Sequence, residues 1–271
     1  MCRWIAYLGP SIPMSLLLVE PQNSLLVQSL QSKEGAEPTN GDGFGVGWYT
    51  GVRDEPGLYR EIRPAWNDEN LKDLSRHLQS GMFLGHIRAA TGSAIQRTNC
   101  HPFRHGRWLF QHNGLIPEFH KIRRKLLMDV DESLFDDIHG STDSEVIFYL
   151  ALGFGLEEDP PAALAKAVGH VERRMKEAGV PMELQFSAAV ANGESLYAVR
   201  YSSVRASRSL HYSRDVDVIS EFYPEAEQAP PGSILVVSEP LGDVARWNDV
   251  PESSLIVADG ESVSLSAFEP V

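Results

Sequence analysis

The sequence contains few cysteines and no long apolar run. Cys2 and Cys100 are the only cysteines among 271 residues, which argues against a secreted fold held by several disulfides. The N-terminus has no basic run followed by an apolar run, and stretches such as Ile147 to Leu156 are too short to span a bilayer. We therefore expect a cytoplasmic protein without a signal peptide or a membrane span.

Positive charge is also scarce, with 24 Lys and Arg against 37 Asp and Glu and a formal net charge of -13. A protein that binds nucleic acid non-specifically needs clustered basic residues to neutralise phosphates. Nucleic acid is therefore not an expected partner. The densest basic stretch, Lys121 to Lys125, lies in a short helical pattern and is interpreted as a solvated helix face.

Apolar runs with a period of two predict strands towards both ends of the chain. The predicted strands are Arg3 to Leu8, Phe44 to Tyr49, Leu58 to Ile62, Phe83 to Ile87, Trp108 to His112, Leu184 to Ala191, Ser195 to Tyr201, Ile234 to Ser238 and Leu255 to Ala258. The pair Asn192-Gly193 predicts a tight hairpin turn with positive φ angles.

Apolar residues at helical spacing predict the main helices between these two groups of strands. One helix follows Asn67-Asp68, another begins at Asp143, and a third runs from Pro160 to Ala178. This order favours a layered α+β domain over alternating βαβ units. Because no linker, repeat or low-complexity segment divides the chain, residues 1–271 are predicted to form a single domain.

Cys2, directly after the initiator methionine, is a candidate nucleophile. Methionine aminopeptidases act before side chains this small, so removal of Met1 would leave a cysteine with a free α-amine. The thiol could then attack a substrate, and the amine, with an unperturbed pKa of about 8, could relay the proton. The alternative is a small buried residue on a first strand, which is how most free cysteines behave.

Two charged residues could hold a substrate. Arg88 follows the apolar run Phe83 to Ile87, where its guanidinium would either grip a carboxylate in a bidentate manner or form an internal salt bridge. Asp143 begins an apolar helix. A carboxylate there usually caps the helix, but it could instead face a cleft and hold an ammonium group.

Asn113 and Gly114 follow the strand that begins at Trp108. The Asn113 amide and the Gly114 N–H could point in nearly the same direction, as the oxyanion of a tetrahedral intermediate requires; a plain turn is the alternative. A glycine-rich segment from Asn40 to Trp48 lacks the ending of a phosphate-binding loop. Alternate glycines in a strand are tolerated where a backbone or a ligand approaches closely.

Together these segments resemble the class II glutamine amidotransferases, a branch of the N-terminal-nucleophile hydrolases. The four motifs of that family occur in order: Cys2 after the initiator methionine, Gly-His-x-Arg-x-x-Thr at 85 to 91, His-Asn-Gly at 112 to 114, and Thr-Asp-Ser-Glu at 142 to 145. Ser238-Glu239-Pro240-Leu241 and Trp247 are similar to the stand-alone subgroup. That subgroup contains the ergothioneine-pathway amidohydrolase and the amidotransferase-like subunit of fungal glutathione breakdown.

The resemblance implies a four-layer αββα sandwich with two stacked, mainly antiparallel sheets. It also implies hydrolysis of a γ-glutamyl amide through a γ-glutamyl thioester, without a cofactor. The substrate head is a zwitterion, and one Arg and one Asp complement it. The implied roles are nucleophile for Cys2, oxyanion hole for Asn113 and Gly114, α-carboxylate binding for Arg88 with Thr91, and α-ammonium binding for Asp143.

Two departures from the family pattern loosen the expected pocket. Ala89 stands where an aromatic residue usually follows the Arg, and Gly92 stands where a His often follows the Thr. No second catalytic domain is recognisable, which favours a γ-glutamyl amide larger than glutamine, or partnership with a separate synthase or hydrolase chain.

Other classes of function stay open. A non-catalytic γ-glutamyl-binding or regulatory subunit is one, and an N-terminal-nucleophile amidase for another acyl group is a second. His86, His101, His105 and His112 match no common zinc spacing, so no metal is expected. Cys100 lies in no recognised motif and is interpreted as a buried residue.

Overall fold

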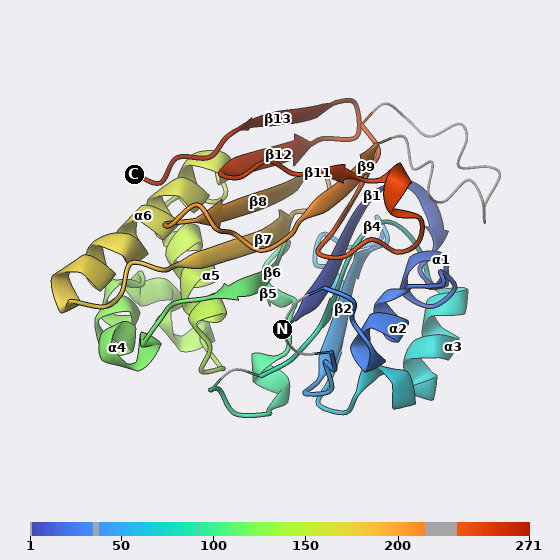
Figure 1. The fold of residues 1–271 in the computed structure, drawn as a ribbon, viewed down its shortest axis with the longest axis horizontal. Helices are drawn as coiled ribbons and strands as arrows, with labels where there is room; N and C mark the ends of the chain where they lie inside the picture. Colours follow the sequence, from blue (N-terminus) through green and yellow to red (C-terminus); the bar gives the residue numbers. More distant parts are fainter. Residues whose placement is uncertain (1, 35–37, 91, 215–231) are drawn as a thin grey trace.

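The protein forms two stacked antiparallel sheets, as a computed structural model of residues 2–34, 38–90, 92–214 and 232–271 shows (Figure 1). The first sheet contains β1 (Arg3–Pro13), β2 (Phe44–Tyr49), β3 (Gly57–Glu61), β4 (Gln79–Ile87), β9 (His211–Arg214), β10 (Ile234–Val237) and β11 (Asn248–Asp249), in the order β11-β9-β10-β1-β4-β2-β3. The second contains β5 (Phe103–His105), β6 (Trp108–Leu115), β7 (Gln185–Ala191), β8 (Leu196–Ser202), β12 (Ser254–Ala258) and β13 (Val263–Ala267), in the order β13-β12-β8-β7-β6-β5.

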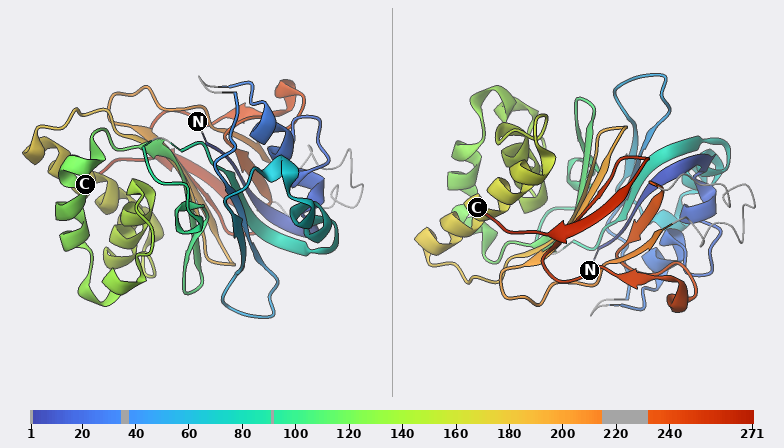
Figure 2. Two further views of the ribbon diagram at one scale, coloured as in Figure 1. Left: turned by 90° about the horizontal axis from the view of Figure 1, so that it is seen from below. Right: turned by 90° about the horizontal axis from the view of Figure 1, so that it is seen from above.

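Helices cover the outer face of each sheet (Figures 1 and 2). On the first sheet lie α1 (Ser15–Leu18), α2 (Leu25–Leu30) and α3 (Glu69–His77), and on the second lie α4 (Phe119–Asp129), α5 (Asp143–Gly153) and α6 (Pro160–Ala178). Short 3-10 turns span Ala65–Asn67, Arg97–Asn99, Glu132–Asp137 and Val244–Arg246. Within the described ranges, no helix has the length and apolarity needed to traverse a bilayer.

Three apolar layers hold the sandwich together. Phe110 and Phe148 pack between the second sheet and its helices, whereas Ile5 packs between the first sheet and α1–α3. Trp4 and Leu109 fill the space between the two sheets. Because successive side chains of a strand point to opposite faces, neighbours such as Trp4 and Ile5 serve different layers. The predicted αββα sandwich is confirmed.

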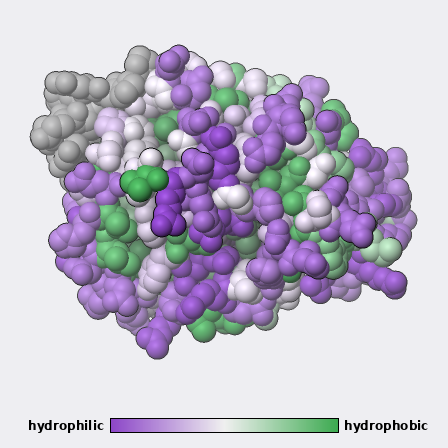
Figure 3. Space-filling model, turned by 180° about the vertical axis from the view of Figure 1, so that it is seen from behind, coloured by the Kyte–Doolittle hydropathy of each residue, from purple (hydrophilic) through white to green (hydrophobic). Residues whose placement is uncertain are grey.

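The face seen from behind is mostly hydrophilic, and its apolar residues form scattered patches (Figure 3). This agrees with the excess of acidic residues in the sequence. In α4 the basic residues Lys121, Arg124 and Lys125 are exposed while Ile122 is buried. The solvated helix face predicted for this stretch is confirmed.

The apolar patterns located most elements but not all their ends. The bounds of β2 and α6 are those predicted, and α5 begins at Asp143. By contrast, β1 continues past a bulge between Leu8 and Ile12, which interrupts the period of two and hides the extension. The predicted hairpin forms between β7 and β8, but of the pair Asn192-Gly193 only Gly193 has the predicted positive φ. The Asn192 side chain instead accepts the N–H groups of Glu194 and Ser195.

Glycines in β2 accommodate the protein's own backbone. A Cβ on Gly45 would overlap the carbonyl oxygen of His101, and a Cβ on Gly47 would lie 2.7 Å from the Leu109 Cδ1 atom. The segment that carries His101 therefore packs directly against β2 and fixes one wall of the cavity described below.

Gly45→Ala is expected to lower the free energy of unfolding by about 1–3 kcal/mol, because a backbone oxygen cannot rotate away from the added methyl group. Gly242→Ala is the matched control, since a Cβ there meets no atom within 4 Å. Urea unfolding of the two variants measures the difference. Equal unfolding midpoints would contradict the steric explanation.

Candidate active site

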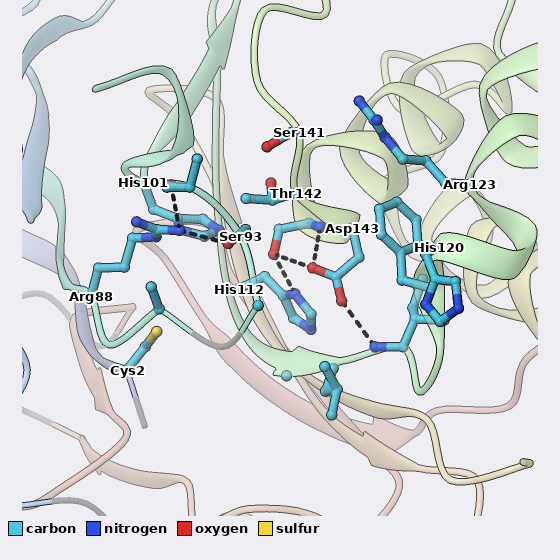
Figure 4. Close-up of a pocket in the computed structure, with 18 of the residues that line it drawn as sticks. Cys2, Arg88, Ser93, His101, His112, His120, Arg123, Ser141, Thr142 and Asp143 are labelled. Carbon is cyan, nitrogen blue, oxygen red and sulfur yellow. Dashed lines mark hydrogen bonds between the residues drawn. The ribbon is translucent and has the colours of Figure 1, made fainter. Parts of the chain in front are cut away.

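The site is a cavity of about 440 Å³ at one edge of the sandwich, where the ends of β4 and β6 meet the start of α5 (Figure 4). Four predicted site residues line it: Cys2, Arg88, Gly114 and Asp143. Asn113 contacts Cys2 from the neighbouring position on β6. Thr91 and Met1 lie outside the described residues, so the binding role predicted for Thr91 stays a prediction.

Sheet register brings Cys2 and Arg88 together. β1 and β4 are antiparallel, with Arg3 opposite Ile87, so Cys2 and Arg88 are the next residues beyond the paired ends. Cys2 is half-buried, and its Sγ lies 3.4 Å from the Ala89 nitrogen and 3.5 Å from the Ala89 oxygen. Cys2 therefore lies outside β1 and against a cavity, unlike a small core residue of a first strand.

The Arg88 guanidinium is buried but has no carboxylate partner among the described residues. It donates to the Ser93 Oγ at 2.6 Å, to the Ala94 oxygen at 3.2 Å and to the Asp42 main-chain oxygen at 3.3 Å. The internal salt bridge considered from the sequence is thus absent from the described part of the chain. An uncompensated buried cation is costly, so this geometry suits an anionic group brought by a ligand.

Asp143 lies at the first position of α5, and Thr142 is the N-cap. The Thr142 Oγ1 accepts the N–H of Glu145 at 3.2 Å, so the N-cap position belongs to Thr142 and not to Asp143. Its carboxylate instead accepts the N–H groups of Ile116 at 2.9 Å and Ser144 at 2.8 Å. These bonds hold the carboxylate in place, and it faces the cavity (Figure 4).

Asn113 and Gly114 lie within β6, so the plain turn considered from the sequence is wrong. The Asn113 Nδ2 donates to the Cys2 carbonyl oxygen at 2.8 Å, and its Oδ1 accepts from Arg208 Nη1 at 3.5 Å. Because a guanidinium only donates, Arg208 orients the amide nitrogen towards Cys2. The amide nitrogen carries a second hydrogen, which this bond leaves free.

His112 joins β6 to the start of α5. Its Nε2 lies 3.2 Å from the Gln185 carbonyl oxygen, and its Nδ1 lies 2.8 Å from the Ser144 Oγ. Since a carbonyl can only accept, the ring proton lies on Nε2 and the Ser144 hydroxyl donates to Nδ1. Burial lowers the pKa of His112. The neutral ring thus fixes Ser144, and with it the neighbouring Asp143.

His112 also explains why position 114 is glycine. A Cβ on Gly114 would overlap the Nε2 atom of the His112 ring and the carbonyl oxygen of Gln185. The strand therefore reaches the cavity with its backbone uncovered at this position.

His86, His101 and Cys100 are buried. The rings of His86 and His101 lie 4.2 Å apart, and burial lowers the pKa of His86 to about 3. Among the described residues, no group of three or more His, Cys, Asp or Glu side chains could hold a metal ion. Burial raises the pKa of the Cys100 thiol, so the prediction that Cys100 is a buried residue is confirmed.

Sequence reasoning missed several residues that support the site. Ser93 receives a hydrogen bond from Arg88, Arg208 orients Asn113, and Arg3 contacts the Cys2 carbonyl oxygen. Arg3 stands beside Cys2 in the chain, but no pattern marks its side chain as functional. Arg208 lies 95 residues from Asn113, so no local motif could connect them.

Comparisons with known proteins match nearly the whole chain. A sequence model described as "Glutamine amidotransferases class-II" matches residues 16–270. The probable glutamine amidotransferase DUG3 of Saccharomyces cerevisiae is 33% identical over 98% of this chain and 84% of its own. A gamma-glutamyl-hercynylcysteine sulfoxide hydrolase of Mycobacterium tuberculosis is 26% identical over 99% and 97%. The solved structure of a glutamine aminotransferase class-II domain protein from Silicibacter pomeroyi has a TM-score of 0.73 and 33% identity, over 99% of this chain and 100% of that one.

Proposed function

Because the chain belongs to the class II glutamine amidotransferases, we propose that it hydrolyses a γ-glutamyl amide with Cys2 as the nucleophile. One observation carries the proposal. The Cys2 thiol, an Arg88 guanidinium without a carboxylate partner among the described residues and the Asp143 carboxylate line a single cavity.

The two charged side chains complement an amino-acid head. The α-carboxylate of a γ-glutamyl group would bind Arg88, and its α-ammonium would bind Asp143. Thr91 is proposed to assist Arg88. This arrangement supports a γ-glutamyl substrate over a simple acyl amide, which offers no group to either charge.

The proposed reaction begins once Met1 has been removed. The freed α-amine takes the proton of the Cys2 thiol, and Sγ attacks the γ-carbonyl carbon. Asn113 Nδ2 and the Gly114 N–H stabilise the oxyanion. The C–N bond then breaks as the α-ammonium returns the proton to the leaving nitrogen. Water, deprotonated by the same amine, hydrolyses the γ-glutamyl thioester to glutamate and regenerates the thiol.

The leaving amine is proposed to be larger than ammonia. A cavity of about 440 Å³ lies in the size range of sites for drug-sized ligands. Ala89 and Gly92 add little bulk to its lining, and Phe119, His120 and Arg123 line it beyond the charged pair. The M. tuberculosis relative is named for a γ-glutamyl sulfoxide conjugate. We propose that the chain acts on such a small molecule by itself, and the match to this hydrolase over 97% of its own length supports this.

The proposal is tested by incubating the isolated protein with glutamine, glutathione and γ-glutamyl sulfoxide conjugates, and with simple acyl amides as controls. Glutamate release is expected only from γ-glutamyl compounds, and intact mass should show a chain lighter by one methionine. Binding without release would support the non-catalytic alternative. Release of simple acyl groups would support the other amidase class.

Arg88→Ala is expected to weaken substrate binding by about 2–4 kcal/mol, because the substrate carboxylate would be desolvated without its partner. The KM for a γ-glutamyl substrate should rise about 30- to 900-fold, with a smaller change in kcat. Arg97→Ala is the control, since Arg97 is exposed and pairs with Glu61 at 3.0 Å outside the cavity. An unchanged KM in Arg88→Ala would remove Arg88 from the binding role.

A further inference from the structure

Arg3 and Glu239 form a buried ion pair directly behind Cys2. Arg3 Nε donates to Glu239 Oε2 at 2.8 Å, and the two side chains are only 4% and 1% exposed. Burying two charges is costly unless further hydrogen bonds satisfy them. The remaining contacts of both groups therefore indicate what the pair does.

The other end of the Arg3 guanidinium holds the main chain of Cys2. Arg3 Nη1 donates to the Cys2 carbonyl oxygen at 3.0 Å, and Asn113 Nδ2 donates to the same oxygen at 2.8 Å. Arg3 and Ile87 are the first paired residues of β1 and β4. Cys2 therefore lies one residue outside the hydrogen-bonded part of the sheet. In the described part of the chain, the Arg3 and Asn113 side chains donate to the Cys2 carbonyl oxygen in place of a main-chain N–H of a neighbouring strand.

Glu239 is itself fixed from several segments. Its carboxylate accepts Asn23 Nδ2 and the N–H of Lys33, both at 3.0 Å, and the N–H of Glu34 at 3.0 Å. The preceding residue, Ser238, exchanges hydrogen bonds with the main chain of Trp4. The carboxylate therefore sits in a rigid frame attached to β1, and it holds Arg3 in one orientation.

We propose that Arg3 is a positioning residue for the nucleophile, and that Glu239 keeps Arg3 in place. The inference rests on the proposed function of Cys2. Chain ends fray unless they are tied down, and once Met1 is removed no earlier peptide bond anchors Cys2. Productive geometry must be held to within about 0.5 Å. The Arg3 contact keeps the Cys2 main chain still, so that Sγ and the α-amine stay directed at the substrate carbonyl.

The kinetic test uses Arg3→Lys, which keeps the charge. A single ammonium cannot reproduce the planar fork that reaches both Glu239 and the Cys2 oxygen. Because a displacement of about 1 Å in an active site can cost about 100-fold, kcat is expected to fall roughly 10- to 100-fold. The KM should stay within about twofold, since Arg88 and Asp143 are untouched. Arg174→Lys, which alters the ion pair between Arg174 on α6 and Asp129 on α4, should leave both constants unchanged.

The double variant Arg3→Met with Glu239→Gln removes both charges of the pair, so neither is left buried without a partner. It therefore controls for misfolding caused by an unpaired charge. Thermal unfolding of both variants establishes that they are folded, and the kcat loss should appear in each. A loss of kcat without a change in KM is not expected from a merely structural pair.

A third readout needs no turnover. A nitroxide spin label on Cys2, in a Cys100→Ala background, should give an immobilised spectrum that narrows in Arg3→Lys and in the double variant. If no γ-glutamyl compound is hydrolysed by the parent protein, the proposed function fails while these spectra still test the positioning role. A parental kcat in an active Arg3→Lys variant, or spectra that do not change, would overturn the inference.

Discussion

Cys2→Ala is expected to abolish γ-glutamyl amide hydrolysis, by on the order of 10⁴-fold or more in kcat, because the attacking atom itself is removed. The fold should persist. Among the described residues, the hydrogen bonds of the Cys2 Sγ go to the Ala89 main chain, at 3.4 and 3.5 Å, and alanine retains the Cβ. Glutamate release measures turnover, and thermal unfolding measures stability.

Cys100→Ala is the control for this variant. Cys100 is fully buried, and burial raises the pKa of its thiol, so it should supply no nucleophile. Its removal should leave turnover close to that of the parent protein. Parental kcat in Cys2→Ala, or loss of turnover in Cys100→Ala alone with the fold intact, would show that the nucleophile is misassigned.

Asn113→Ala is expected to lower kcat by about 10²- to 10³-fold, the usual cost of removing one oxyanion donor. Both thioester formation and thioester hydrolysis should slow, since each passes through an oxyanion. The KM should change less, because neither substrate charge contacts Asn113 in the proposed mode. Rapid-quench detection of the thioester separates the two steps.

Gln111→Ala is the matched control for Asn113. Gln111 also lies on β6, two positions earlier, and its Nε2 donates to the Ile5 oxygen at 2.9 Å. That bond joins the two sheets away from Cys2, so its loss should lower stability but leave kcat nearly unchanged. Normal thioester formation in Asn113→Ala would remove Asn113 from the oxyanion role.

The site residues that sequence could locate all lie at the ends of strongly patterned elements. Arg88 follows β4, Asn113 is near the end of β6, and Asp143 starts α5. A pattern shows where an element ends, but the register between strands decides which ends meet. Cys2 lies beside Arg88 only because Arg3 pairs with Ile87, and that pairing is a tertiary property.

The supporting contacts could not be predicted because they join distant segments. Glu239 lies 236 residues from Arg3, and the pattern of the predicted strand Arg3 to Leu8 does not show which residue pairs with Arg3. Short elements were missed for a different reason. α1 has only four residues, too few to display helical periodicity. The single-domain organisation of residues 1–271 stays a prediction.

The three imidazoles near the cavity have a consequence for the acid range. Burial lowers the pKa values of His86, His101 and His112, that of His86 to about 3. In the unfolded chain their pKa values would be near 6.5. Unfolding in mild acid therefore protonates these histidines, which are neutral in the native state. The native state therefore keeps their full contribution above pH ~6.5 and loses up to about 1.4 kcal/mol per histidine for each pH unit below it. Mild acid is therefore expected to destabilise the fold through these three buried rings.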